Sequence, residues 1–353
     1  MQLPVMPPVQ PMLAKAVTGV PEQGSVAGGL LYEPKWDGFR CLVFRDGDDV
    51  VLGSRGSKTL ERYFPELVEA AIAHLPRRCV VDGEIVVRRG ESGSQRLDWD
   101  VLAQRIHPAA SRVARLAAET PAELVAFDLL AEGDLSLLDE PFGGRRARLE
   151  ELLGGLDAAA PVHLTRVSGD AAVARDWFDA FEGAGLDGVV AKPLAATYQP
   201  GKRVMLKIKH ARTAEAVVLG YRVHKSGRGV GSLLLGLYTD DGQLRQVGGA
   251  SAFTDKRRLE LVDELEPLVV LDEHGEHVRA SGEPSRFNSG RDSSWVPLRP
   301  EVVVEVRYDQ MEAGRFRHTV QVARWRIDRE PASCTYDQLD RPLAYDLDAV
   351  LDH

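Results

Sequence analysis

Long hydrophobic runs are the first thing that this chain of 353 residues lacks. No stretch approaches the ~20 consecutive apolar residues that a membrane-spanning helix requires, so we expect no membrane association. The amino-terminal stretch MQLPVMPPVQPML is interrupted by prolines and has no basic segment, which is not typical of a signal peptide. These features predict a cytoplasmic protein. The length exceeds that of one typical core and predicts two domains.

Cysteine is also scarce, and the motifs of several common active sites are absent. Cys41, Cys79 and Cys334 lie far apart without CxxC or Cys/His spacing, which argues against a disulfide framework and a zinc site. The chain has no GxxxxGKS/T loop, no GxSxG elbow and no HExxH helix, which argues against P-loop, serine hydrolase and zincin chemistry. The glycine-rich stretch 226–232 precedes a strand-like run rather than a helix, so we predict a hairpin turn there.

Positive charge is in deficit overall, because the formal net charge is -9. Such a balance discourages nucleic-acid binding, which depends on lysine and arginine neutralising phosphates. The basic residues are nevertheless clustered. One cluster lies at 202–228 and holds eight basic residues against the single acid Glu215; the second comprises Arg315, Arg317, Arg324, Arg326 and Arg329. A solvated surface would explain either cluster, but two of them in an acidic chain indicate a localised polyanion site.

The hydrophobic patterns change near residue 211. Before it, residues 30–60 alternate between apolar and polar around a turn at Asp46-Gly47-Asp48, which predicts a hairpin. Helical and strand-like segments follow it. We expect helices near 60–75, 98–118, 143–155 and 170–182, and strands at 79–88, 123–130, 188–193 and 204–210. After residue 211 strand-like runs dominate, with one helix near 254–268 that Thr254 can cap. We predict an α+β chain with domains at 1–210 and 211–353, the second a small closed β-barrel of the OB type.

Charged side chains interrupt several of the apolar strands. Lys207 and Lys209 are two residues apart in KIK, so a strand places both ammonium groups on one face. Asp82 and Glu84 share a face in the same way within VVDGEIVV, and buried charges are unfavourable unless they are paired or bind a metal. An ordinary strand edge explains the lysines equally well. Taken alone, each of these pairs more often has a structural role than a catalytic one.

Lys35 changes this assessment. It lies in EPKWDGFR, directly before the predicted hairpin strand. A lysine with a pKa of ~10.4 becomes a nucleophile at neutral pH only through burial or nearby positive charge. Pro34 and Trp36 offer apolar surroundings, and the lysine pair with a bound divalent cation would add positive charge. The combination indicates phosphoryl chemistry, in which cations polarise phosphates, carboxylates hold Mg²⁺ and an amine attacks phosphorus.

The residues around Lys35 also carry a family resemblance. KWDGFR at 35–40 resembles the KxDGxR signature of the covalent nucleotidyltransferases, which comprise ATP-dependent DNA ligases, RNA ligases and mRNA capping enzymes. Further blocks follow in the family's order: SRG at 54–56, DGEIV at 82–86, AFDLL at 126–130, DGVVAK at 187–192, LKIK at 206–209 and RWRIDR at 324–329. PMLAK at 11–15 and the carboxyl-terminal region are similar to bacterial stand-alone ligases of the ligase C type. The resemblance implies an adenylation (nucleotidyltransferase) domain of antiparallel sheets flanked by helices, followed by an OB-fold barrel.

The resemblance implies a role for each matching residue around the nucleotide. Lys35 would attack the α-phosphorus of ATP, release pyrophosphate and retain AMP through a phosphoramidate bond. Glu33 would lie beside the adenine, and Phe127 would stack on its face. Arg40 and Arg55 would contact nucleotide or nicked-strand phosphate.

Further residues would hold phosphates and metal. Phosphate oxygens would be bound by Arg203, Lys207 and Lys209. Glu84 would take the ribose hydroxyl or, with Asp187, a Mg²⁺ or Mn²⁺ ion. Many relatives have glutamate at the position of Asp187 and lysine at that of Arg329, so these two positions depart from the family pattern. The barrel would supply Arg324, Arg326 and Asp328 to orient the departing pyrophosphate.

We therefore expect a monomeric ATP-dependent DNA ligase that seals nicks in double-stranded DNA, in DNA repair. Its barrel would swing between the adenylation step and the sealing step. Two alternatives remain open at this point. One is an RNA ligase or capping-type guanylyltransferase with the same covalent chemistry. The other is a noncatalytic nucleic-acid-binding protein that retains the ligase fold.

Overall fold

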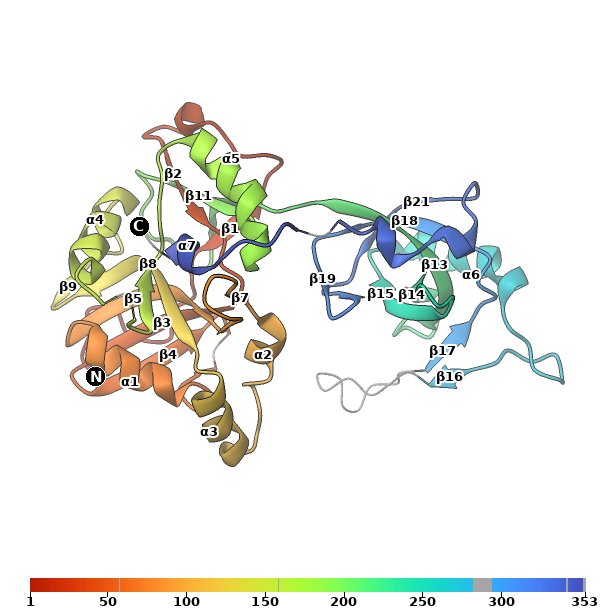
Figure 1. The fold of residues 1–353 in the computed structure, drawn as a ribbon, viewed down its shortest axis with the longest axis horizontal. Coiled ribbons are helices and arrows are strands. Elements are labelled where there is room, and N and C mark those ends of the chain that lie inside the picture. Colours follow the sequence, from red (N-terminus) through yellow and green to blue (C-terminus); the bar gives the residue numbers. More distant parts are fainter. Residues whose placement is uncertain (57, 158, 282–293, 341, 352–353) are drawn as a thin grey trace. The chain divides into compact units, whose positions relative to one another are not determined.

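The computed structural model describes residues 1–56, 58–157, 159–281, 294–340 and 342–351 (Figure 1). They form two compact units: Met1–Lys209 together with Pro342–His353, and His210–Arg341. The change of pattern near residue 211 thus coincides with the start of the second unit. We predicted that the second domain continues to residue 353, whereas the last described residues belong to the first unit. No helix among the described residues is long and apolar enough to cross a membrane.

Two β-sheets form the centre of the first unit. The larger has the order β10-β8-β5-β3-β4, with β9 beside β8, and the smaller has the order β1-β12-β11-β2. The larger sheet comprises β3 (Phe39–Asp46), β4 (Asp49–Ser54), β5 (Arg78–Val86), β8 (Glu123–Glu132), β9 (Leu135–Ser136) and β10 (Val162–Leu164). The smaller sheet comprises β1 (Leu13–Ala16), β2 (Leu30–Pro34), β11 (Val189–Pro193) and β12 (Arg203–Ile208).

Most neighbouring strands are antiparallel, as expected, but two pairs are parallel. These are β10 with β8 and β1 with β12. A parallel pair requires a crossover connection of a dozen or more residues, and the segment between β8 and β10 contains such a crossover with a helix. The expected antiparallel sheets thus each carry one parallel pair at an edge.

Helices and short strands complete the first unit. The helices are α1 (Pro65–His74), α2 (Trp99–Ala103), α3 (Ala110–Glu119), α4 (Phe142–Leu153) and α5 (Ala171–Ala180), followed by α7 (Asp348–Leu351) at the end of the chain. The short elements are β6 (Arg88–Arg89), β7 (Arg96–Leu97), η1 (Gln23–Ser25) and η2 (Phe181–Ala184). Pro65 begins α1, as predicted. The single helix predicted at 98–118 is split into α2 and α3, because Pro108 disfavours a helical residue before it.

The period of two along β3 explains how the two sheets are layered. Cys41 and Val43 face a core that contains Phe64 of the α1 region. Leu42 and Phe44 face the opposite way, into a core that contains residues of β12 and of the amino-terminal segment. The larger sheet is therefore covered by helices on one face and by the smaller sheet on the other.

The second unit is built mainly from strands. One sheet has the order β15-β14-β13-β17-β16, and β18 pairs with both β13 and β21. Its elements are β13 (Arg212–Val223), β14 (Val230–Tyr238), β15 (Leu244–Ala250), α6 (Asp255–Leu265), η3 (Glu266–Leu268), β16 (Ala280–Ser281), β17 (Ser294–Pro297), β18 (Val303–Tyr308), β19 (Met311–Glu312), β20 (Arg315–Phe316), β21 (Gln321–Trp325), η4 (Pro331–Ser333) and η5 (Tyr336–Gln338).

Three features of this unit agree with the sequence. β13 and β14 form the hairpin predicted at 226–232, and the Thr254 side chain caps α6 by accepting from the Arg257 amide. A bridge from Ala250 to Val320 joins β15 to the chain before β21. The sheet thus curls back on itself, which is consistent with the predicted OB-type barrel.

The carboxyl-terminal segment 342–351 packs within the first unit. The Leu347 amide donates to the Gln95 carbonyl at 2.9 Å, and Arg88 pairs with Asp348 at 3.0 Å. The Leu347 and Val350 side chains are buried with the aromatic residues of α5 and η2. Gly183 is required here, because a Cβ at this position would clash with the Leu343 carbonyl. The sequence missed this docking because α7 is too short to show a helical period.

We predict that Leu347→Asp releases the segment 342–351. The substitution removes the burial of one leucine, worth ~1.5–3 kcal/mol, and places a charge among apolar side chains. The melting temperature should fall, and hydrogen–deuterium exchange of 342–351 and of the Gln95 amide should accelerate. Leu343→Asp is the matched control, because Leu343 lies in the same segment and is 90% exposed. Equal effects of the two substitutions would contradict the docking.

Candidate active site

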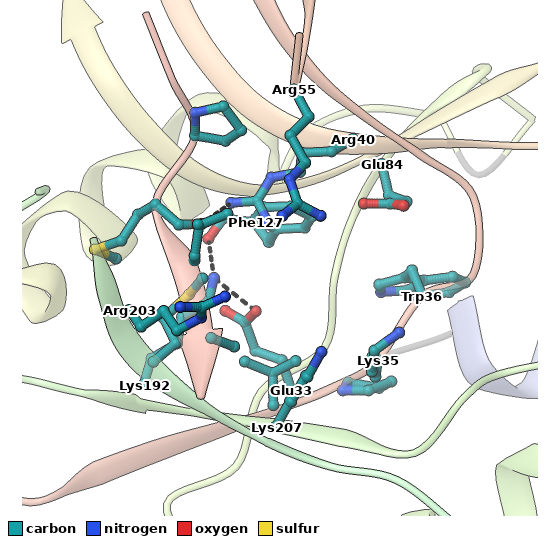
Figure 2. Close-up of a pocket in the computed structure, with 17 residues that line it drawn as sticks. Glu33, Lys35, Trp36, Arg40, Arg55, Glu84, Phe127, Lys192, Arg203 and Lys207 are labelled. Atoms are coloured by element: carbon teal, nitrogen blue, oxygen red, sulfur yellow. Dashed lines mark hydrogen bonds and ion pairs between the residues drawn. The ribbon is translucent and has the colours of Figure 1, made fainter. Parts of the chain in front are cut away.

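A cavity of about 250 Å³ lies between the two sheets of the first unit. Figure 2 shows charged side chains from both sheets pointing into it. Its lining includes most residues that the sequence singled out: Glu33, Lys35, Arg40, Arg55, Glu84, Phe127, Arg203 and Lys207. Lys192, which the sequence analysis did not select, also lines it. The strands therefore bring together blocks that are spread over most of the first unit.

Lys35 and Asp187 face each other across a strand pair. The Lys35 Nζ lies 2.6 Å from Asp187 Oδ2, and the Lys209 Nζ lies 2.7 Å from the same oxygen. The backbones are linked as well, because the Lys35 amide donates to the Gly188 carbonyl and the Asp187 amide to the Lys35 carbonyl. Burial opposes ionisation of Asp187, but the two ammonium groups hold its pKa below the ordinary value. Asp187 is therefore an ionised counter-ion to both lysines.

Lys207 adds positive charge on the cavity side of β12. Partial burial, followed by the charges of Lys209 and Lys35, lowers its pKa. Lys207 lines the cavity while Lys209 contacts Asp187, so the two lysines of KIK do serve one region, as the strand period predicted. This cluster suits an anion with several negative charges, because such a ligand would relieve the mutual repulsion of the ammonium groups.

At the other end of the cavity, Glu33 and Lys192 form a buried ion pair. The Lys192 Nζ lies 2.7 Å from Glu33 Oε2 and donates to the Phe127 carbonyl at 3.1 Å. The Phe127 ring is 6% exposed, and its centroid lies 4.5 Å from the Lys192 Nζ and 4.5 Å from the Arg40 Cζ. The stacking of a base on Phe127 stays a prediction. A base that stacks there must share the ring with these cations.

Asp82 and Glu84 differ in environment although both lie on β5. Asp82 is fully buried and accepts two hydrogen bonds from Arg40, at 2.5 and 2.6 Å, and one from the Tyr198 hydroxyl at 2.7 Å. Glu84 instead lines the cavity. The pairing of β5 with β3 is regular through both residues, with Asp82 opposite Leu42 and Glu84 opposite Arg40, so the two carboxylates share a face as the strand period predicted. Asp82 is occupied by Arg40 and Tyr198 and is a structural partner that orients Arg40.

The residues predicted to hold a metal ion are Glu84 and Asp187. They fit a metal ion whose other ligands are mainly phosphate oxygens of the substrate. Among the described residues, no three His, Cys, Asp or Glu side chains gather into a metal site. Glu84 faces the cavity, whereas Asp187 Oδ2 already accepts from two ammonium groups. Mg²⁺ commonly uses one or two carboxylates together with substrate phosphates and water. Glu84 is therefore the better placed of the two carboxylates.

The predicted barrel residues belong to the second unit. Arg324 on β21 pairs with Glu305 at 2.7 Å, and Arg326 pairs with Asp328 at 2.8 Å and with Glu215. These contacts place the arginines of RWRIDR in one network at the end of β21. Their role at the cavity of the first unit stays a prediction.

We predict a pH dependence of stability that comes from Glu84. Burial raises its pKa from the ordinary 4.5 to about 7, against the opposing charges of Arg40 and Lys35. The folded state thus holds this proton more tightly than the unfolded state, so stability is greatest below about pH 4.5 and falls as pH rises through about 7. The slope for one proton reaches at most ~1.4 kcal/mol per pH unit.

Urea unfolding of the wild type and Glu84→Gln, from pH 5 to 8 with EDTA, checks this expectation. Glu84→Gln should remove the part of the slope that this carboxyl contributes. Glu151→Gln, at an exposed position on α4, should leave the wild-type profile unchanged. The same pH profile in all three proteins would rule out the assignment to Glu84.

Comparisons with known proteins identify the family of the chain. Residues 11–209 match the family model of the ATP dependent DNA ligase domain, and residues 226–329 match that of the ATP dependent DNA ligase C terminal region. The chain is 58% identical to DNA ligase C1 of Mycolicibacterium smegmatis, covering 100% of this chain and 99% of that protein.

DNA ligase C of Mycobacterium tuberculosis is 56% identical, with 99% of each chain covered. A solved structure described as a Lig E DNA ligase shares the fold, with a TM-score of 0.55 at 18% identity, covering 90% of this chain and 99% of that one. The family models match well over half of the chain, and these relatives are similar over nearly all of it. The chain belongs to the ATP-dependent DNA ligase family.

Proposed function

We propose that this chain seals nicks in double-stranded DNA with ATP, through a lysyl-AMP intermediate on Lys35. The observation that carries the proposal is the position of Lys35 at the cavity, 2.6 Å from Asp187, with Lys207 and Lys209 beside it. The named relatives are DNA ligases, which favours DNA over RNA as the substrate. An inactive ligase fold would not need to retain all of these charged groups around one cavity.

The first step forms a bond from the Lys35 Nζ to the α-phosphorus of ATP and breaks the bond to the bridging oxygen, so that pyrophosphate leaves. Lys35 must first lose a proton, and Asp187 is the acceptor within hydrogen-bond reach. Lys207 and Arg203 line the cavity and would hold phosphate oxygens as charge develops on them. Lys209 would balance the charge of Asp187.

A Mg²⁺ or Mn²⁺ ion would be held by Glu84 together with phosphate oxygens, and when bound it would neutralise part of the triphosphate charge. Arg40 is oriented by Asp82 at one wall of the cavity. Arg55 lines the same wall and would contact the nicked strand.

The later steps act on DNA. AMP passes from Lys35 to the 5′-phosphate at the nick, and the neighbouring 3′-hydroxyl then attacks that phosphate and expels AMP. Arg324, Arg326 and Asp328 of the second unit would assist the departure of pyrophosphate in the first step only. We infer a monomer that acts in DNA repair in the cytoplasm. These assignments stay predictions.

We predict that Lys35→Arg abolishes activity. Arginine retains the charge but does not lose its proton in proteins, so it cannot form the bond to phosphorus. Formation of the AMP adduct should fall by at least ~10³-fold. Mass spectrometry with ATP, before and after addition of pyrophosphate, measures the adduct and its reversal.

The exposed Lys15 on β1 provides a control, because Lys15→Arg should retain the adduct. Sealing assays with nicked DNA and with nicked RNA distinguish a DNA ligase from an RNA ligase, and labelled GTP tests for guanylyl transfer. Nick sealing by Lys35→Arg at the wild-type rate would refute the proposal.

We further predict that Arg326→Ala slows only the first step. Loss of a cation that faces the departing pyrophosphate should reduce lysyl-AMP formation by ~10²-fold. Sealing of a nick that already carries AMP on its 5′-phosphate bypasses this step and should proceed at the wild-type rate. Arg299→Ala, at an exposed residue that pairs with Glu301, should affect neither rate. If Arg326→Ala slows both steps equally, its role is not specific to pyrophosphate.

A further inference from the structure

The carboxyl-terminal segment 342–351 packs directly against η2. The Phe181 and Tyr345 ring centroids lie 5.2 Å apart, with an angle of 54° between the ring planes. A Cβ at Gly183 would lie 2.7 Å from the Tyr345 amide nitrogen and closer still to the Leu343 carbonyl oxygen. Figure 1 shows α7, at the end of this segment, among the elements of the first unit. The segment and η2 therefore touch through both side chains and backbone.

The strand β7 contacts both of them as well. The Gln95 amide, directly before β7, donates to the Asp346 carboxylate at 3.0 Å, and the Gln95 carbonyl accepts from the Leu347 amide at 2.9 Å. Gly185 follows η2 in a left-handed conformation, and a Cβ at this position would lie only 3.0 Å from the Leu97 Cβ. The carboxyl-terminal segment, β7 and η2 thus form one packed group.

Asp187 follows this packed group and belongs to no helix or strand. It lies between η2 and β11. The preceding Leu186 is 1% exposed and lies in the same core as Leu347 and Phe181. The Leu186 amide donates to the Phe181 carbonyl at 3.3 Å, and the Asp187 amide donates to the Lys35 carbonyl at 3.0 Å. A continuous series of contacts therefore links Leu347 to the backbone of Asp187.

The backbone of Asp187 decides where its carboxylate lies. Its Oδ2 contacts the Lys35 Nζ at 2.6 Å and the Lys209 Nζ at 2.7 Å. A short side chain in an irregular stretch cannot compensate for a shift of its own backbone. A misplacement of about 1 Å at a reacting group can slow a reaction by ~10²-fold. The placement of the residues before Asp187 therefore bears on the transfer of the Lys35 proton.

We propose that the carboxyl-terminal segment is a positioning element for Asp187. Through Tyr345 and Leu347 it holds η2 and the residues after it, so that the carboxylate stays within reach of the Lys35 amine while lysyl-AMP forms. This inference rests on the proposed function, since it concerns the acceptor of the Lys35 proton. The segment follows the second unit directly in the chain. It acts on the first step of the reaction although none of its described residues lines the cavity.

Gly183→Ala tests this inference without changing the cavity or Asp187. The backbone of Gly183 is not left-handed, so alanine is compatible with it, but the new methyl group would displace Leu343 and Tyr345. In single-turnover experiments at saturating ATP, lysyl-AMP formation should slow by ~10–100-fold. The half-saturating ATP concentration should change by less than ~2-fold, because the groups that line the cavity are retained.

Gly155→Ala is the matched control for this substitution. A Cβ at Gly155 would meet no atom of the described residues within 4 Å, its chain neighbours aside. The control should therefore form lysyl-AMP at the wild-type rate.

A double substitution tests whether the effect acts through Asp187. Asp187→Asn removes the carboxylate that accepts from Lys35, so the segment then has no acceptor to position. In the Asp187→Asn background, Gly183→Ala should slow lysyl-AMP formation by less than ~2-fold, because substitutions that act through one group are not additive. A general loss of stability would instead slow the reaction by the same factor in both backgrounds.

Leu347 provides an independent pair of variants at the buried end of the segment. Leu347→Asp should release the segment and slow lysyl-AMP formation as much as Gly183→Ala does. Leu347→Met keeps an apolar side chain of similar volume and should stay near the wild-type rate. Hydrogen–deuterium exchange of the Asp187 amide should accelerate in Leu347→Asp and in Gly183→Ala, and this measurement does not depend on activity. If one of these two variants fails to fold, the other keeps the test decisive.

The outcomes separate the inference from the proposed function. The inference is wrong if folded Gly183→Ala forms lysyl-AMP at the wild-type rate, or if its loss is equally large in the Asp187→Asn background. Unchanged exchange of the Asp187 amide in both variants would overturn it as well. If the wild-type protein forms no adduct with ATP, the proposed function itself fails, whereas faster exchange of the Asp187 amide in the variants would still support the positioning of Asp187.

Discussion

The pairing of β2 with β11 is the constraint on which the site depends. Pro34 lies opposite Val189 in this ladder, so Lys35 leaves one strand at the point where Asp187 approaches the other. The reciprocal backbone hydrogen bonds around Gly188 fix both segments. A mobile lysine side chain is thereby held against a carboxylate that lies 152 residues away in the sequence. The register of the strands, more than the burial of Lys35, places the amine at the cavity.

Strand pairing in both sheets explains why buried charges are tolerated around the cavity. Desolvation of an isolated charge is strongly unfavourable, but a pair with good geometry and further hydrogen bonds can offset it. Glu33 and Lys192 meet this condition across β2 and β11, and Asp82 with Arg40 across β5 and β3. Each pair leaves atoms directed at the cavity. Charge pairing thus supports the fold and presents polar groups to a ligand at the same time.

Much of this arrangement could be predicted from the sequence, because local spacing decides which residues share a strand face. Lys207 and Lys209 follow the period of two, and the blocks around Lys35 and Asp187 carry a family pattern. Lys192 was missed although it ends the block 187–192, because its importance comes from Glu33, a partner on a distant stretch of chain. Asp82 and Glu84 share a face of β5 as the period of two predicts, but the partners of Asp82, Arg40 and Tyr198, lie on other stretches of the chain and could not be read from the sequence.

The connections between the second unit and the first bear on the same ion pair. The chain leaves the first unit after Lys209 and returns at Pro342, so the second unit is joined to the first at two points. Lys209 is itself a partner of Asp187, which means that a rotation of the backbone at this junction acts directly on the ion pair beside Lys35. The other junction leads within a few residues to Leu347 and Val350, which are held in an apolar core. A movement of the second unit about both junctions would therefore act at one end on the charges around Lys35 and be restrained at the other by hydrophobic packing.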